Sequence, residues 1–134
     1  MIVLDASFVG ALMLPDEPDA PLAVKERVAR GPLIAPAHWP LESANMLHVA
    51  VRRRRIDRAG RDDALQQIDA LGVSVDPGSG ESLRRTVAFA DRYGLTIYDA
   101  AYLDLAIDYR AALASRDTDL IRAAAAADLE IVTF

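Results

Sequence analysis

The sequence MIVLDAS at the start of the chain constrains the fold more than any other feature, because four apolar residues lead directly to the carboxylate of Asp5. Apolar residues continue from Ala6 to Met13, so the pattern predicts a short buried strand that turns at once into an apolar helix. Asp5 then lies at the carboxyl end of this strand. Ligands and reacting groups gather at that edge in open parallel α/β sheets, which makes Asp5 a candidate site residue.

Apolar strands alternate with helices along the rest of the chain. Short apolar runs bounded by turn residues predict four more strands, at residues 33–35, 73–75, 112–114 and 131–134. Apolar residues at helical spacing predict helices between them, at about residues 21–30, 40–55, 57–71, 81–93, 98–109 and 117–127. This order predicts one α/β domain over residues 1–134, a three-layer α/β/α arrangement in which a parallel sheet of about five strands lies between helices.

The composition is that of a folded domain without cysteine chemistry. Apolar residues make up 52% of the chain, and the absence of cysteine excludes disulfides, zinc–thiolate sites and a cysteine nucleophile. The sequence contains neither a P-loop nor a GxGxxG motif. No apolar run approaches the roughly 20 residues of a membrane span, and Asp5 stands where a signal peptide has basic residues. We therefore expect a cytoplasmic protein without a membrane segment.

The formal net charge of −5 is distributed unevenly. Residues 25–61 contain nine basic and three acidic residues, so this segment carries +6 and the rest of the chain −11. A basic segment on an acidic body is compatible with a polyanionic ligand. Within it, Arg52–Arg55 end a predicted helix, and two interpretations stay open: these side chains contact a polyanion, or they complement the negative end of the helix dipole.

Four carboxylates are predicted to lie at the carboxyl edge of the sheet. Asp5 and Asp117 follow the first and fourth strands, and Glu42 and Asp99 lie in the first turns of helices that begin at this edge. Each acid taken alone is explained more simply as a helix cap or as a favourable charge at the positive end of a helix. Together they form a pattern that a divalent cation would satisfy, because such an ion is the simplest way to neutralise several carboxylates that converge without cationic partners, and no lysine or histidine is near Asp99 in sequence.

The chemistry of the candidate ligands limits which metal ion and which reaction are plausible. All four candidate ligands offer oxygen atoms, which favours Mg²⁺ or Mn²⁺ over zinc. Such an ion activates water for attack on a phosphodiester and stabilises charge on the leaving oxygen. Hydrolysis of a nucleic acid is therefore the hypothesis that the acids support.

Helical periodicity separates Asp99 from the other acids of its helix. At about 100° per residue, Asp104 and Asp108 point roughly 140° and 180° away from Asp99, and are predicted to face solvent. Asp99 shares its side with Leu103 and Ala106. We therefore expect Asp99 to face the body of the domain, where an unpaired carboxylate is costly.

Four motifs in this order resemble the PIN-domain nucleases, and the length and element order resemble the small VapC-type ribonuclease toxins of toxin–antitoxin pairs. The motifs are IVLDASF at the start, Pro40-Leu41-Glu42, LTIYDAAYLDLA from Leu95 to Ala106, and LASRDTDLIRAA from Leu113 to Ala124. The resemblance implies an endoribonuclease that depends on Mg²⁺ or Mn²⁺, a PIN-like fold over the whole chain, and a hydrolytic reaction at RNA phosphodiester bonds.

The resemblance also implies roles for particular residues. Asp5, Glu42, Asp99 and Asp117 would be the catalytic, metal-binding acids, with further support from Ser7, Ser115 and Asp119. Asp119 would supply or share the role of the fourth acid, since it lies two residues after Asp117.

The implied partners are an RNA substrate, a cognate VapB-type antitoxin and a second copy of the chain in a homodimer. Arg52, Arg53, Arg54 and Arg55 would then contact RNA or the antitoxin. One alternative stays open, in which the chain is a non-catalytic PIN-like module that binds RNA or protein and keeps its acids only as helix caps.

Overall fold

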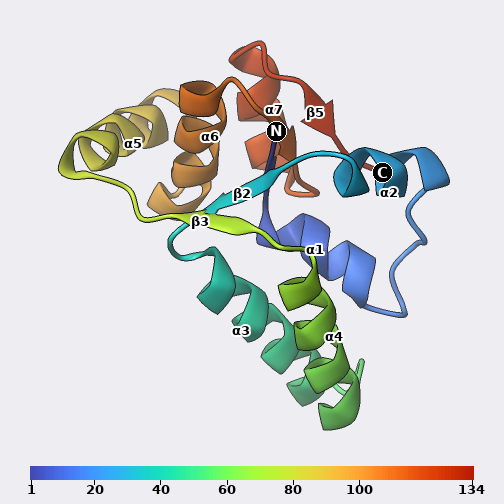
Figure 1. The fold of residues 1–134 in the computed structure, drawn as a ribbon. Coiled ribbons are helices and arrows are strands. Elements are labelled where there is room, and N and C mark those ends of the chain that lie inside the picture. The colour runs from blue at the N-terminus through green and yellow to red at the C-terminus, as the bar shows by residue number, and fades with distance from the viewer.

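The centre of the structure, a computed structural model that describes residues 1–134, is a sheet of five parallel strands in the order β3-β2-β1-β4-β5 (Figure 1). The strands are β1 (Ile2–Leu4), β2 (Leu33–Pro36), β3 (Ser74–Asp76), β4 (Ala112–Ala114) and β5 (Ile131–Val132). Each pairs with its neighbours in parallel, as the sequence predicts. β3 begins one residue later than predicted, and β5 ends two residues earlier.

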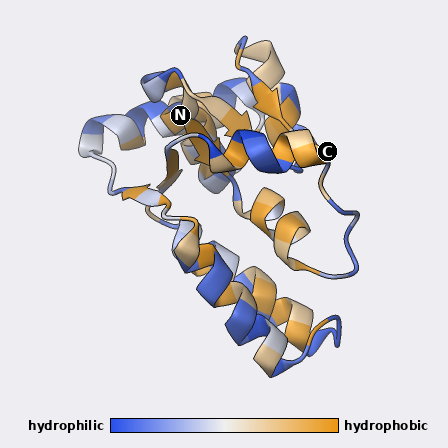
Figure 2. Cartoon of the chain, turned by 45° about the vertical axis from the view of Figure 1, so that its right-hand side comes forward, coloured by the Kyte–Doolittle hydropathy of each residue, from blue (hydrophilic) through white to orange (hydrophobic).

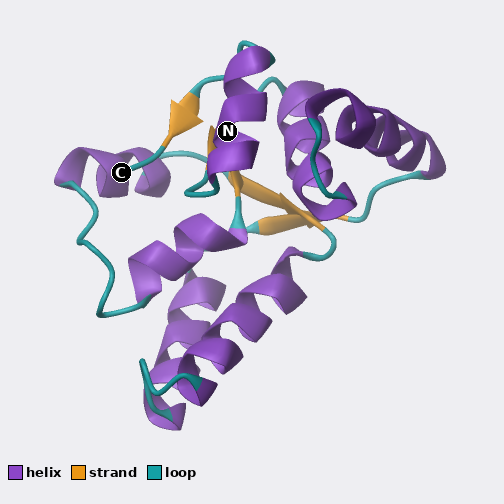
Figure 3. Cartoon of the chain, turned by 180° about the vertical axis from the view of Figure 1, so that it is seen from behind, coloured by secondary structure: helices purple, strands orange, loops and turns teal.

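Seven helices cover the sheet in two layers. They are α1 (Ala6–Met13), α2 (Leu22–Ala29), α3 (Trp39–Arg52), α4 (Arg58–Ala70), α5 (Gly80–Tyr93), α6 (Ile97–Tyr109) and α7 (Thr118–Ala126). α3 packs between α1 and α4 on one side, whereas α6 contacts β1, β2 and β4 on the other and lies between α5 and α7 (Figure 3). This arrangement confirms the three-layer α/β/α fold. No helix is both long and apolar enough to cross a membrane.

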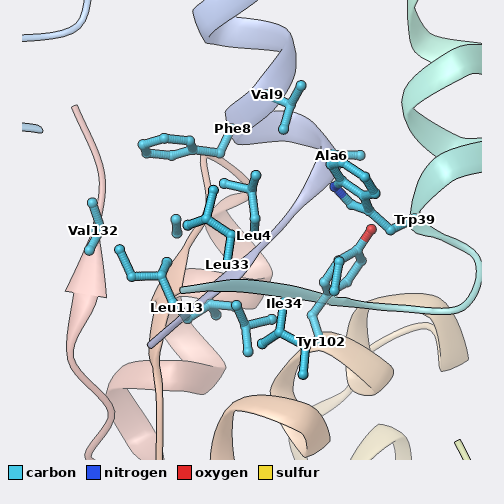
Figure 4. Packing of buried hydrophobic residues seen from close by; sticks show 14 of the residues in the cluster. Leu4, Ala6, Phe8, Val9, Leu33, Ile34, Trp39, Tyr102, Leu113 and Val132 are labelled. Carbon is cyan, nitrogen blue, oxygen red and sulfur yellow. The ribbon is translucent and has the colours of Figure 1, made fainter. Parts of the chain in front are cut away.

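β1 is the centre of the hydrophobic core because it pairs with strands on both sides. Val3 lies in register with Ile34 of β2 and with Leu113 of β4. Figure 4 shows Leu4 and Phe8 on the α1 side of these strands, and Figure 2 shows the strands as predominantly hydrophobic. All three residues of β1 are fully buried, which explains why a run of three apolar residues is sufficient to form the central strand.

The chain leaves β1 and β4 in opposite directions across the sheet. From β1 it passes through α1 and α2 to β2, whereas from β4 it passes through α7 to β5, on the other side of β1. The carboxyl ends of the neighbouring strands β1 and β4 therefore form the topological switch point, where open α/β sheets bind ligands. Asp5 follows β1 at this point, and Ser115 follows β4.

The middle of α6 is buried on every side, and this overturns the solvent position that periodicity predicts for Asp104. Asp104 is only 3% exposed. α5 packs along this side of α6 and brings two partners to the Asp104 carboxylate: the guanidinium of Arg85 and the hydroxyl of Thr86, which donates at 3.0 Å. Asp108 is exposed as predicted and lies 3.3 Å from Arg85. Because the sheet covers α6 on one side and α5 covers it on the other, the middle of α6 has no face exposed to solvent.

Local sequence signals set the ends of several helices. Thr96, the N-cap of α6, accepts a hydrogen bond from the backbone N–H of Asp99 at 3.1 Å, and Asp57 accepts one from the N–H of Gly60 at 2.7 Å at the start of α4. Gly94 ends α5 in the left-handed conformation, with φ of 67°. These caps confirm the predicted boundaries on either side of the α5–α6 connection.

α3 and α4 form a helical hairpin that projects from the body of the domain (Figure 1). The hairpin packs closely on α1 through α3. Gly10 of α1 lies so near Met46 of α3 that a Cβ atom added to Gly10 would be 2.2 Å from Sδ of Met46. The turn between the two helices is held by Arg55, whose guanidinium donates to Asp16 at 2.7 and 2.9 Å and to Glu17 at 2.6 Å. The loop between α1 and α2 thus fixes the turn of the hairpin.

Candidate active site

Asp5 lies at the switch point, enclosed by the two central strands and the start of α1. It is 4% exposed, and although it occupies the N-cap position of α1, its carboxylate does not cap that helix. Two hydroxyls donate to the same oxygen instead: Ser7 from α1, and Ser115 from the end of β4 at 2.7 Å. Oδ1 is left without a side-chain donor. The Asp5 carboxylate therefore forms no cap hydrogen bond with α1, and is held instead by the two serines that the resemblance implies as further support.

The two serines also hold the loop that leads to α7. The backbone N–H of Arg116 donates to Oγ of Ser7 at 2.9 Å, and the N–H of Asp117 donates to Oγ of Ser115 at 3.0 Å. Each hydroxyl therefore accepts a hydrogen bond from this loop while donating to Asp5. This network fixes the Asp5 carboxylate between β1 and β4 without any cationic side chain.

Burial raises the pKa of Asp5 above its ordinary value of 3.8. The hydroxyls of Ser7 and Ser115 act in the opposite direction, because they hydrogen-bond to the charged form, and the nearby charge of Glu42 raises the pKa further. The effect of Glu42 shows that these two acids are electrostatic neighbours. No arginine or lysine forms an ion pair with either of them, so the negative charge at the switch point is not compensated by the protein.

Glu42 reaches the site from the first turn of α3. The hydroxyl of Tyr102, on α6, donates to its Oε2 at 2.5 Å. Nε2 of His38 lies 3.6 Å from the same oxygen, which is too long for a hydrogen bond. The His38 ring packs between Tyr98 and Tyr102, with centroid distances of 5.4 and 5.1 Å. Glu42 thus has a single strong partner, and that partner is a neutral phenol.

Tyr102 is fully buried, and its environment is negative. Burial, the hydrogen bond to Glu42 and the charges of Asp5 and Glu42 together raise the pKa of Tyr102 far above its ordinary value of 10. The phenol therefore remains a hydrogen-bond donor throughout the working pH range. Sequence reasoning missed this residue, although it lies in the motif LTIYDAAYLDLA, three positions after Asp99 and so on the same face of α6.

Asp99 lies at the start of α6, partly exposed, rather than in the interior. Oγ1 of Thr96 donates to its carboxylate at 2.6 Å while accepting from its backbone N–H, so Thr96 caps the helix and also holds the Asp99 side chain. The predicted neighbours Leu103 and Ala106 are buried below it, as expected. Asp99 therefore already has a polar partner, which the sequence interpretation did not include.

Asp117 and Asp119 differ in their partners. Asp117 is the N-cap of α7, and its Oδ1 accepts from the N–H of Leu120 at 2.8 Å. Asp119 is exposed and forms an ion pair with Arg122 at 2.9 Å. Of the two candidates for a fourth acid, only Asp117 is connected to the Asp5 network, through the hydrogen bond of its backbone to Ser115.

The structure thus brings together Asp5, Ser7, Ser115, Glu42 and Tyr102, and places Asp99 and Asp117 at helix ends on the same edge. No group of three or more His, Asp or Glu side chains is arranged closely enough to hold a metal ion as the side chains stand. The chemistry of the donors nevertheless fits Mg²⁺ or Mn²⁺: they are carboxylate oxygens, and neither Asp5 nor Glu42 pairs with an arginine or a lysine. An ion would supply the missing positive charge.

The basic segment divides into paired and unpaired arginines. Arg55 forms ion pairs with Asp16 and Glu17, and so fixes the hairpin turn. Arg52, Arg53 and Arg54 are exposed and form no ion pair, and the turn that they occupy is strongly hydrophilic (Figure 2). Ten residues of α3 separate Arg52 from Glu42, a distance of about 15 Å along the helix. A ligand that contacts both regions must be extended.

Comparisons with known proteins agree with this fold. The family model described as the PIN domain matches residues 2–126. The crystal structure of PAE2754 from Pyrobaculum aerophilum is similar, with a TM-score of 0.69 and 25% sequence identity over 91% of this chain and 78% of that chain. The crystal structure of VapC20 from Mycobacterium tuberculosis, described as a toxin that cleaves the sarcin-ricin loop, has a TM-score of 0.64 and 18% identity over 92% and 95% of the two chains. No curated protein is a significant match to the sequence.

Proposed function

The chain belongs to the PIN domain family, and from this premise we propose that it is an endoribonuclease that depends on Mg²⁺ or Mn²⁺. One observation carries the proposal: Asp5 is buried at the switch point beside Glu42, and no arginine or lysine pairs with either acid. A buried carboxylate normally has such a partner, because desolvation penalises its charged form. A site of this kind is suited to a divalent cation and, through it, to a phosphodiester.

In the proposed reaction, Asp5 and Glu42 would hold the ion, and Asp99 and Asp117 would complete its ligands from the first turns of α6 and α7. A bound Mg²⁺ or Mn²⁺ would supply a Lewis acid that lowers the pKa of the attacking water and stabilises charge on the phosphate. Ser7 and Ser115 orient the Asp5 carboxylate through one oxygen and leave Oδ1 for a ligand.

The unpaired arginines of the α3–α4 turn support a polyanionic substrate. We infer that Arg52, Arg53 and Arg54 contact phosphates of the RNA about 15 Å along α3 from Glu42, whereas Arg55 is structural. Arg55 therefore fits neither of the two earlier interpretations, because its ion pairs hold the hairpin turn. An acidic segment of an antitoxin is the competing ligand for the same three arginines.

The similarity to VapC20 supports a finer proposal, namely that the enzyme acts as the toxin of a type II toxin–antitoxin pair. In that role it would form a homodimer, act in the cytoplasm and be inhibited by a VapB-type antitoxin. One observation favours the alternative of a non-catalytic binding module: the Asp117 carboxylate makes the hydrogen bond of a helix cap, and the Asp99 carboxylate is already bonded to Thr96, the N-cap of α6.

A metal-dependent cleavage assay separates the two functions. The purified protein is incubated with total bacterial RNA in Mn²⁺, in Mg²⁺ and in EDTA, and the fragments are resolved by electrophoresis. We expect cleavage with either metal, none in EDTA, and recovery when Mn²⁺ is added back. Asp5→Asn is expected to reduce the cleavage rate by about 10³-fold or more, which corresponds to about 4 kcal/mol of transition-state stabilisation. Cleavage by Asp5→Asn at the wild-type rate, or equal cleavage in EDTA, would contradict the proposed site.

A further inference from the structure

A single phenol connects the helix of Asp99 with the carboxylate of Glu42. Tyr102 lies on α6, three residues after Asp99 and so on the same face of the helix, and its hydroxyl donates to Oε2 of Glu42 at 2.5 Å. Glu42 belongs to α3, in the layer on the opposite side of the sheet. The hydrogen bond therefore connects Glu42, from one helix layer, with the helix that carries Asp99 in the other layer.

The donor is rigid. Tyr102 is 0% exposed, and the edge of its ring packs against His38 with the ring planes at 75°. Figure 4 shows its hydroxyl directed toward Trp39, at the start of α3, from a ring that is surrounded by core side chains. A buried aromatic ring in a packed core keeps one orientation, so the position of the hydroxyl is set by the fold.

The acceptor is mobile by comparison. The Glu42 side chain is 40% exposed and has three rotatable bonds. Only the Tyr102 hydroxyl donates a hydrogen bond to it, since His38 lies at 3.6 Å. Without Tyr102, only the His38 ring, at 3.6 Å from Oε2, would remain beside the Glu42 carboxylate, and no hydrogen bond would hold it.

We propose that Tyr102 is a positioning residue, whose hydroxyl fixes Oε2 of Glu42 so that Oε1 is presented as a metal ligand beside Asp5. This inference rests on the proposed function, because it treats Glu42 as a ligand of the divalent cation. Tyr102 acts through Glu42 and does not touch the reacting atoms. Partners that orient metal ligands typically change metal affinity or activity by 10- to 100-fold.

Tyr102→Phe is the direct test, because it removes the hydroxyl and keeps the ring. Tyr109→Phe is the matched control: it removes a second phenol–carboxylate hydrogen bond, 2.9 Å long, between the same helix and Asp76. Three quantities are measured for both variants and for the wild type. They are the Mn²⁺ dissociation constant by titration calorimetry, kcat and KM on an RNA oligonucleotide that spans a mapped cleavage site, and the unfolding temperature of the metal-free protein.

We expect Tyr102→Phe to weaken Mn²⁺ binding by about tenfold or more and to lower kcat with little change in KM for RNA. Tyr109→Phe should bind Mn²⁺ and cleave RNA like the wild type. If Tyr102→Phe matches the wild type in both measurements, while the wild type is active, the inference is overturned and the proposed function stands. A wild-type protein that neither binds Mn²⁺ nor cleaves RNA would overturn both.

A second genetic background keeps the test valid if Tyr102→Phe unfolds at a lower temperature than Tyr109→Phe. In the Glu42→Gln variant the carboxylate that Tyr102 is proposed to position is already gone. Adding Tyr102→Phe to this variant should therefore change its Mn²⁺ affinity by less than twofold. A defect in folding would persist there. An undiminished effect of Tyr102→Phe in Glu42→Gln would therefore show that Tyr102 acts only on the structure.

Discussion

Asp5 and Asp104 are both buried carboxylates, 4% and 3% exposed, but only one of them has a cationic partner. Asp104 receives the guanidinium of Arg85 and the hydroxyl of Thr86, where α5 packs on α6. Asp5 receives two serine hydroxyls and the repulsion of Glu42. The protein supplies a cation for the first carboxylate and none for the second.

The difference shows that partners, rather than burial, distinguish a structural acid from a candidate site. The same distinction separates Arg55, which pairs with two acids, from Arg52–Arg54, which pair with none. It also separates Asp119, which is paired with Arg122, from Asp117. Each of these pairs offers a variant and a matched control.

Replacing Arg85 with alanine should have the largest effect on stability, because it leaves Asp104 buried without its cation. We expect the free energy of unfolding to fall by about 3 kcal/mol, the low end for a broken buried pair, since the Arg85 side chain is 35% exposed. Urea denaturation measures the loss. Arg84→Ala, which removes an exposed arginine on the same helix, should change stability by less than about 0.5 kcal/mol. Equal losses of unfolding free energy in Arg85→Ala and Arg84→Ala would show that the buried Asp104 does not need Arg85 as its cationic partner.

Replacing Arg52, Arg53 and Arg54 together with alanine should weaken RNA binding by about tenfold or more at low salt. The slope of log affinity against log salt should become shallower by about 2, since each phosphate contact on a single strand contributes about 0.7. Fluorescence anisotropy in EDTA measures binding without cleavage. Arg55→Ala should leave the slope unchanged while lowering stability. If Arg55→Ala changes the salt slope as much as the triple substitution does, paired and unpaired arginines do not differ in their contact with RNA.

Asp117→Asn should separate the capping role of Asp117 from its proposed role as a ligand. Asparagine caps a helix as well as aspartate does, so the free energy of unfolding should change by less than about 0.5 kcal/mol. Mn²⁺-dependent cleavage should fall about tenfold, equivalent to about 1.4 kcal/mol. Asp119→Asn is expected to leave cleavage at the wild-type rate. Loss of activity in Asp119→Asn alone would assign the fourth acid to Asp119 instead.

Asp5→Asn should have a small effect on the stability of the metal-free protein, and one of opposite sign to the effect of Arg85→Ala. Because burial raises the pKa of Asp5 above 3.8, the folded protein binds a proton at pH values where the unfolded chain has released it. Wild-type stability therefore falls as the pH rises from 3.8 through the raised pKa.

Asparagine removes that dependence, so Asp5→Asn should equal or exceed the wild type by up to about 1 kcal/mol at pH 7, with a smaller difference near pH 4. Thermal unfolding in EDTA across this pH range provides the measurement, with Asp91→Asn, at an exposed acid, as the control. If Asp5→Asn destabilises the metal-free protein at neutral pH, the Asp5 charge is compensated after all.

Local sequence determined the order of the strands and helices, because apolar runs and turn residues act over a few positions. It also determined that Asp5 follows the first strand and that Glu42, Asp99 and Asp117 lie at the starts of helices. Parallel strands joined by helices place all their carboxyl ends on one side of a sheet. That the four acids lie at one edge of the sheet was therefore predictable without tertiary information.

Only the tertiary structure decided which charges are compensated. Periodicity identifies the face of α6 on which Asp104 lies, but the packing of α5 on that face buries Asp104 and supplies Arg85. Likewise, only the crossing of α3 and α6 at the edge of the sheet joins Tyr102 to Glu42, sixty positions apart in sequence. The period of a helix is a local property, whereas the partner of a buried side chain is contributed by distant parts of the chain.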